Sequence, residues 1–270
     1  MLEDFLARIF VNQWVVFGFV TILLIALAEV GYRLGIVSRR RNPDAASGHS
    51  GSVQGAVLGL LGLLLGFSFA MSVGRFESRR DLLLQEANTI GTTWLRADFL
   101  PAPYDRQVKD LLLRYTNLRI DGFPAMEGSE LFRKTRAEVA EIHRALWQCA
   151  DAAVEAKPTP AVVSFVSSLN ETIDLDASRL AARRNRVPGA VWLLLLAVAS
   201  CSAWASGYSS GVNNTRSVFS ELAFPLLIGV VITLIADIDR PVRGLVGVSV
   251  APLEDLLETI RPEPLSEKSR

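Results

Sequence analysis

Residues 53–74 read VQGAVLGLLGLLLGFSFAMSVG, an apolar run without a charged side chain. As a helix rising about 1.5 Å per residue, a run of about 20 residues crosses a hydrocarbon core of about 30 Å. Three more runs of this kind cover residues 13–32, 188–209 and 218–238. Two runs precede a polar middle and two follow it. The sequence therefore predicts an all-α integral membrane protein whose four transmembrane helices form two hairpins.

The polar middle is predicted to be a helical domain inserted between the second and third transmembrane helices. The chain then divides into an N-terminal membrane hairpin at 1–74, a cytoplasmic domain at 75–187, a C-terminal membrane hairpin at 188–238 and a cytoplasmic tail at 239–270. Between the first two runs, Arg33–Ser52 ends in a stretch containing Gly, Ser and Pro, and we expect an irregular loop there.

Four helices are predicted in the middle domain, because apolar side chains recur there at helical spacing between prolines and glycines. They cover Leu82–Phe99, Tyr104–Ile120, Glu130–Ala156 and Ala161–Asn185. The first continues the second transmembrane helix without a break, and the last leads toward the third transmembrane helix.

Arginines near the ends of the apolar runs predict the orientation in the inner (plasma) membrane, since basic residues favour the cytoplasmic side. The side with both termini and the middle domain carries Arg8, Arg75, Arg79, Arg80, Arg179, Arg183, Arg184, Arg186, Arg240 and Arg243. The opposite side carries Arg33, Arg39, Arg40, Arg41 and Arg216. Both termini and the middle domain are therefore expected in the cytoplasm, although the run Arg39–Arg41 opposes this orientation.

Composition argues against several classes of function. The net charge is zero, which gives no reason to expect nucleic acid as a partner. Cys149 and Cys201 are too few for a disulfide framework, and His49 and His143 lack the spacing of metal ligands. No phosphate-binding Gly-rich loop with a Lys, nucleophile elbow or zinc-binding His pair is present, so neither an enzyme nor a cofactor is expected.

The second apolar run has two distinct faces. Small residues recur every three or four positions on one of them, which lets another helix approach closely, at Gly55, Gly59, Gly62, Gly66, Ala70 and Gly74. The other face changes from apolar to hydroxylated to basic along Val57, Leu61, Leu64, Ser68, Ser72, Arg75 and Arg79.

Two interpretations of this second face remain open. The serine hydroxyls can bond to backbone carbonyls one turn back while the arginines bind lipid phosphates. Alternatively, the face lines a pore, with an apolar constriction that gates by dewetting and arginines that favour anions.

Carboxylates at the ends of the apolar runs also allow two interpretations. Glu29 can pair with Arg33 four residues later, or it can face the bundle interior or water. Asp237 and Asp239 can bind a cation, or they can pair with nearby arginines, for which the candidates are Arg183, Arg184 and Arg240.

The middle domain carries charges of both signs on helices that are expected to face one another. Glu86 and Arg96 lie on the first of these helices, and Glu171 and Arg179 lie on the last. We expect them to form ion pairs between helices or subunits that set the register, rather than a catalytic site.

Residues 86–101, at the start of the polar middle, read EANTIGTTWLRADFLP. This stretch resembles the signature of a bacterial and plant membrane family of unknown function, often labelled bestrophin-like. Other resembling positions follow in order along the chain: Leu112, Arg114, Tyr115, Arg119, Leu169, Asn170, Glu171, Arg179, residues 237–241, Gly244, Val248, Pro252 and Leu253.

The resemblance implies a relation to bestrophins, which are pentameric anion channels with four membrane helices per subunit and cytosolic termini. It implies a homo-oligomer that passes small ions, with the second helix around the pore. The bulky apolar ladder of the bestrophin neck is replaced here by Val57, Leu61 and Leu64, and the longer acidic run near Asp237 is absent. The alternative is a non-conducting membrane scaffold or sensor whose cytoplasmic domain binds a protein partner.

Overall fold

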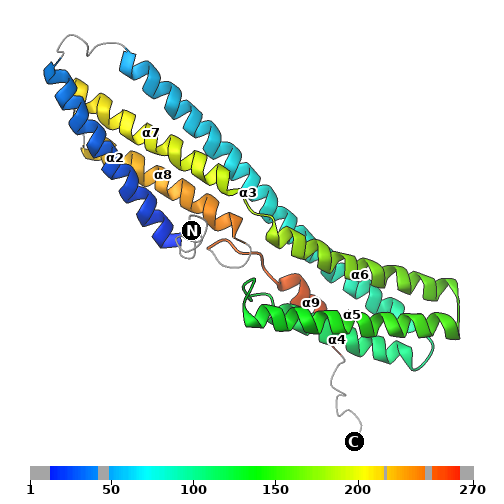
Figure 1. Cartoon of the computed structure of the whole chain (residues 1–270). Coiled ribbons are helices and arrows are strands. Elements are labelled where there is room, and N and C mark those ends of the chain that lie inside the picture. The colour runs from blue at the N-terminus through cyan, green and yellow to red at the C-terminus, as the bar shows by residue number, and fades with distance from the viewer. Residues whose placement is uncertain (1–12, 42–48, 216–217, 241–244, 262–270) are drawn as a thin grey trace, which may run out of the picture. The chain divides into compact units, whose positions relative to one another are not determined.

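The computed structural model describes residues 13–41, 49–215, 218–240 and 245–261. These ranges contain helices and no strand, so the predicted all-α class is confirmed (Figure 1). In chain order the elements are α2 (Gln13–Arg41), α3 (His49–Arg96), the short 3-10 helix η2 (Ala97–Phe99), α4 (Tyr104–Asp121), α5 (Glu130–Ala156), α6 (Pro160–Arg184), α7 (Gly189–Asn213), α8 (Val218–Asp239) and α9 (Ala251–Ile260).

Four helical stretches are long and apolar enough to cross a membrane, and each overlaps one of the four apolar runs. The predicted extent of the first loop is wrong, because α2 continues to Arg41 and α3 already begins at His49. In the part of α2 that follows Arg33, Gly35 packs directly against the backbone of α7. Residues 42–48 lie outside the described part of the chain.

The chain divides into two compact units, and α3 contributes to both. The span unit contains α2, α3 as far as Arg75, α7 and α8. The polar unit contains α3 from Phe76 onward, η2, α4, α5, α6 and α9.

In the span unit, α2 packs closely against α7 and also contacts α8. Glycines make the first contact close: a Cβ atom added at Gly31, Gly35, Gly207 or Gly211 would lie closer than 3.0 Å to backbone atoms of the facing helix. Small residues allow two helix backbones to approach in this way. The nearest partners of the first membrane helix therefore lie far along the sequence, and the two-hairpin arrangement stays a prediction.

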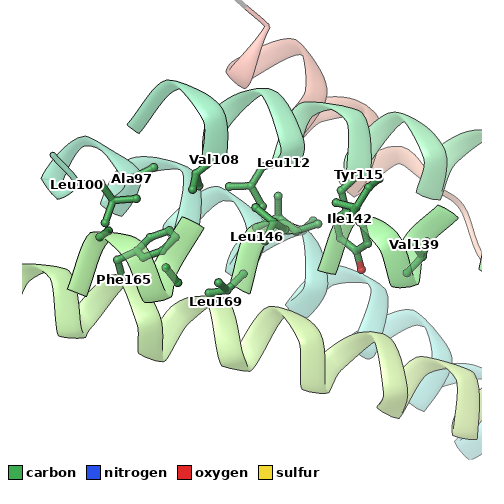
Figure 2. Close-up of a cluster of buried hydrophobic side chains, with 14 of the residues drawn as sticks. Ala97, Leu100, Val108, Leu112, Tyr115, Val139, Ile142, Leu146, Phe165 and Leu169 are labelled. Atoms are coloured by element: carbon green, nitrogen blue, oxygen red, sulfur yellow. The ribbon is translucent and has the colours of Figure 1, made fainter. Parts of the chain in front are cut away.

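The polar unit has its own apolar core, formed by α3, η2, α4, α5, α6 and α9 (Figure 2). Leu112, Leu146, Phe165 and Leu169 are completely buried in it. On α5 the buried residues recur at helical spacing, as an amphipathic helix requires, at Val139, Ile142, Leu146, Ala150 and Ala153. All four helices predicted for this region are present.

The C-terminal helix α9 was not predicted from the sequence, where residues 239–270 were interpreted as a tail. It packs against α4 and buries Leu253 and Ile260. Pro252 at its start and the apolar residues at helical spacing behind it are the signal that could have identified this helix.

Candidate functional site

The face of α3 that was predicted to line a pore is turned toward its own chain. It comprises Val57, Leu61, Leu64, Ser68, Ser72, Arg75 and Arg79, all of them buried or half-buried. Leu61, Ser68 and Ser72 are only 1%, 3% and 0% exposed. A side chain that lines a pore between subunits must be exposed in a single copy. Pore lining by these residues therefore stays a prediction, and their burial does not favour it.

The opposite face of α3 is open and carries the small-residue stripe. A Cβ atom added at Gly55, Gly59, Gly62 or Gly66 would meet nothing within 4 Å. Beside this stripe, on the same open side of α3, Leu63 and Phe67 are 55% and 64% exposed. A face shaped for close approach is thus left uncovered by the described part of the chain.

The serine hydroxyls on the inward face were expected to bond to backbone carbonyls one turn back. The Ser72 hydroxyl oxygen is buried and has no hydrogen-bond partner within the described residues. Ser202 of α7, by comparison, donates to the Val198 carbonyl at 2.8 Å. The hydroxyl of Ser72 is therefore not explained by the local bonding that the sequence suggested.

The carboxylates at the ends of the apolar runs bind protein groups. Arg33 Nε donates to Glu29 Oε1 at 2.7 Å, four residues away on α2. Asp239 accepts from the Val187 backbone N–H at 3.1 and 3.2 Å, just before α7 begins. Its Oδ1 atom also lies 3.7 Å from Arg75 Nη1 of α3. Asp239 thus connects the ends of α8, α7 and the membrane part of α3.

The arginines expected to pair with Asp237 and Asp239 mostly bind elsewhere. Arg184 donates to Glu127 Oε1 at 2.6 Å, and Arg183 donates to the Ala125 carbonyl, both within the polar unit. Asp237 accepts from the Val246 backbone N–H at 3.0 Å, and its charge also acts on Arg240, the third candidate. Arg183 and Arg184 were candidates because they were expected on the same side of the membrane, but α6 directs both arginines into its own unit.

A buried charge cluster connects α3, α4, α5 and α6 in the polar unit. Its centre is Glu86, which is 0% exposed. The Tyr115 hydroxyl donates to Glu86 Oε1 at 2.9 Å, and Arg119 Nε lies 3.0 Å from the same oxygen. Arg179 Nη1 forms an ion pair with the other carboxylate oxygen. One carboxylate thereby joins α3 to both α4 and α6.

A second carboxylate, Asp176, extends this cluster to α5. Arg119 Nη1 lies 2.9 Å from Asp176 Oδ1, and Arg136 Nη1 donates to Oδ2 at 2.6 Å. Arg119 therefore bridges the two carboxylates. We call the set of Glu86, Tyr115, Arg119, Arg136, Asp176 and Arg179 the charge cluster.

Sequence reasoning placed Glu86 and Arg179 in an ion-pair network but missed Asp176 and Arg136. Glu171 is exposed and Arg96 donates to the Ser164 carbonyl at 2.8 Å, so neither belongs to the charge cluster. The signal for Asp176 was its register: it follows the buried residues Phe165, Leu169 and Thr172 at spacings of four and three. A charge in such a register must be buried and paired.

The sequence model of one protein family, the bestrophin-like domain, matches residues 20–253. The chain belongs to the bestrophin-like domain family. With its four membrane-length apolar helices, it is a multi-pass membrane protein. No curated protein matches the sequence.

Solved structures share the fold of this bestrophin-like chain at low sequence identity. Two crystal structures of a bacterial bestrophin homologue from Klebsiella pneumoniae are each 15% identical to it, with TM-scores of 0.64 and 0.61. The first match covers 89% of this chain and 93% of the homologue, and the second covers 88% and 95%. A structure described as a membrane protein is also 15% identical, with a TM-score of 0.65 over 89% and 95% of the two chains.

Burial determines the protonation of the charge cluster in this bestrophin-like chain. Burial raises the pKa of Tyr115 well above its ordinary value, so its hydroxyl remains a donor to Glu86. Burial, together with the neighbouring charge of Arg183, lowers the pKa of Arg179 to about 10. Arg179 is therefore still a cation at neutral pH. Within the described residues, no group of three His, Cys, Asp or Glu side chains is placed to hold a metal ion.

We expect His143 of α5 to make the stability of this unit depend on pH. Its ring centroid lies 5.2 Å from that of Tyr115, and its Nε2 atom is buried without a hydrogen-bond partner among the described residues. Burial lowers the pKa of His143 below its ordinary value, with Arg119 and Arg136 acting in the same direction and Asp176 against it. The unfolded chain then binds the proton more readily, so acidification below about pH 6.5 favours unfolding.

We expect His143→Gln to reduce this dependence. Between about pH 7.5 and about pH 5, the melting temperature of the purified wild-type protein should fall more steeply than that of the variant, because Gln does not take up a proton. Thermal unfolding in detergent across this range measures the difference. Parallel curves for the two proteins would show that His143 does not titrate with folding.

Proposed function

We propose that this bestrophin-like chain assembles with copies of itself into an ion channel in which α3 surrounds the pore. The open glycine-bearing face of α3 carries this proposal, because it is shaped for contact but is left uncovered by the described residues of one copy. Family membership and the likeness in fold to a bacterial bestrophin homologue support it. A pentamer, as in bestrophins, is the assembly that we propose.

The exposed face also suggests which side chains meet the pore. Leu63 and Phe67 lie four residues apart on this face and are among the most exposed apolar side chains of α3. A ring of such side chains, one from each subunit, forms an apolar constriction that gates by dewetting. The face with Leu61 and Ser68, predicted from the sequence, is then the one that anchors α3 to its own subunit.

The proposed topology follows the distribution of arginines. Both termini and the domain at 75–187 lie in the cytoplasm, the membrane hairpins are residues 1–74 and 188–238, and the membrane is the inner (plasma) membrane. The proposed ions are small anions, favoured by Arg80, the exposed arginine that follows the apolar part of α3, whereas Arg75 and Arg79 lie on the covered face. The channel works without an enzymatic step.

Cysteine accessibility distinguishes the two faces of α3. In a background with Cys149→Ser and Cys201→Ser, we expect a charged thiol reagent to block ion flux through Leu63→Cys and Phe67→Cys channels in liposomes. Leu61→Cys and Ser68→Cys channels should be unaffected, because these positions are 1% and 3% exposed. In a chloride gradient, the reversal potential should move toward the chloride equilibrium potential.

Three other outcomes would each contradict one part of the proposed function. Block at Leu61 and Ser68 alone would support the inward face as the pore. A reversal potential near that of the cation would refute anion selectivity while retaining the channel. Absence of flux from an oligomer shown to be intact would refute the channel itself.

Exposed apolar side chains on the polar unit favour a second candidate, the membrane scaffold or sensor. Leu84, Leu95, Phe99 and Trp147 are 48%, 68%, 52% and 45% exposed. Purification from native membranes in mild detergent should then recover a specific protein that is lost when Leu95 and Trp147 are replaced by Ser. Repeated recovery of the chain alone would argue against this function.

A further inference from the structure

The charge cluster borders a cavity that lies entirely within the polar unit. The cavity has a volume of about 70 Å³, several times the roughly 10–15 Å³ that one water molecule needs. The described residues that line it include five arginines and one carboxylate: Arg79, Arg119, Arg136, Arg179, Arg183 and Asp176. A cavity of this size and lining can hold a small ion.

In the described part of the chain, positive charge exceeds negative charge around this cavity. Asp176 and Glu86 supply two carboxylates, and the ion pairs of both are already formed by Arg119, Arg136 and Arg179. Among the described residues, these three guanidinium groups exceed the two carboxylates by one. Like charges brought together away from water repel strongly, and a bound anion relieves that repulsion.

Aromatic rings hold two of the guanidinium groups in place. The Arg179 guanidinium lies 6.0 Å from the centre of the Phe123 ring, and that of Arg183 lies 5.2 Å from the Phe132 ring. Both rings also line the cavity. A guanidinium packed on a ring is held in one plane. Arg179 uses only part of its five N–H donors for Glu86, and the rest of its planar fork can bind an oxyanion oxygen.

Solvent can reach this site. The Arg136 side chain is 33% exposed, whereas those of Arg119 and Arg179 are 13% exposed. Arg136 therefore lies toward the solvent, and the other two lie deeper. An ion can enter past Arg136 without unfolding the unit.

We propose that this cavity is a binding site for a small tetrahedral oxyanion of the phosphate class. Its arginines bind the oxygens, and its volume accommodates one phosphate group but not a nucleotide. The group is supplied either as free phosphate or as the phosphate of a lipid headgroup. Occupation neutralises the excess positive charge and stabilises the contacts between α4, α5 and α6, whether or not the protein conducts ions.

Binding is measured on the full-length protein in detergent, in buffer free of phosphate and sulfate. Sodium phosphate should raise the melting temperature more than sodium chloride at equal ionic strength, and calorimetric titration should show saturation. Arg136→Gln should weaken phosphate binding at least about tenfold, since a fork that binds an oxyanion is lost. Arg133→Gln, the same change at an exposed position of α5 outside the cavity, should change it less than about twofold.

A second variant and a second probe complete the test. If Arg136→Gln does not fold, Arg136→Lys keeps the charge but loses the fork, and it should bind phosphate with intermediate affinity. Stabilisation by micelles containing a short-chain phosphatidic acid, without an effect of free phosphate, would assign the lipid headgroup as the source. Equal effects of phosphate and chloride, without an effect of the lipid, would overturn the proposal. Equal losses from Arg133→Gln and Arg136→Gln would also overturn it.

Discussion

Glu86→Ala should destabilise the protein more than any other single loss of a carboxylate in the polar unit. Glu86 is fully buried, and its removal leaves Arg119, Arg179 and the Tyr115 hydroxyl without their shared partner. Removing one member of a buried ion pair typically costs about 3–5 kcal/mol, because the remaining charge is buried and uncompensated. We therefore expect a fall in melting temperature of roughly 10 °C, measured by thermal unfolding in detergent.

The control is Glu77→Ala, which removes an exposed carboxylate from the same helix. Exposed charges contribute little, so this variant should stay within about 0.5 kcal/mol of the wild type. Glu86→Gln should lie between the two, since its amide oxygen can still accept from Tyr115 while the negative charge is lost. Equal stability of the Ala variants at positions 77 and 86 would show that the charge cluster does not stabilise the fold.

Gly207→Ala should have the largest effect in the span unit. A Cβ atom added at Gly207 would lie closer than 3.0 Å to the backbone of Ala28, and a backbone cannot rotate away as a side chain can. The helices α2 and α7 must then separate along their closest contact. Overpacking of this kind costs typically about 1–3 kcal/mol, and Gly207→Leu should exceed this range. The lowered yield of folded protein and the lowered melting temperature measure the effect.

Gly18→Ala is the matched control, because an added Cβ at that position of α2 meets nothing within 4 Å. Ala favours a helix over Gly by about 1 kcal/mol, so this variant should be neutral or slightly more stable. If Gly18→Ala and Gly207→Ala lowered stability equally, close packing between α2 and α7 would not be the reason.

The charge cluster and the contact between α2 and α7 stabilise different units by different physical means. In the span unit, apolar helices in lipid gain little from burying more apolar surface, so close packing through glycines holds α2 to α7. In the polar unit, water drives burial of the apolar core, and the charge cluster selects which helix faces meet. Substitutions in one unit should therefore leave the packing of the other unit unchanged.

Only part of the charge cluster could be predicted from the sequence. Glu86 lies in the buried register of Leu83, Ala87 and Ile90, which marks it as a buried charge that needs a partner. Arg179, one of the charges expected from the sequence to form ion pairs between helices, does bind Glu86, whereas Glu171 lies on an exposed position of the same helix. The spacing of one helix predicts which residue is buried, but not which residue of another helix faces it.

The sequence alone determined that this chain is helical and that four stretches are long and apolar enough to cross a membrane. This follows because a helix satisfies its backbone hydrogen bonds within one stretch, so length and polarity suffice to recognise it. Only the tertiary structure decided which face of α3 is covered and which stays open, and which arginines Glu86 and Asp176 bind. Those properties depend on residues tens of positions apart. Packing brings these residues together, and no local sequence pattern predicts it.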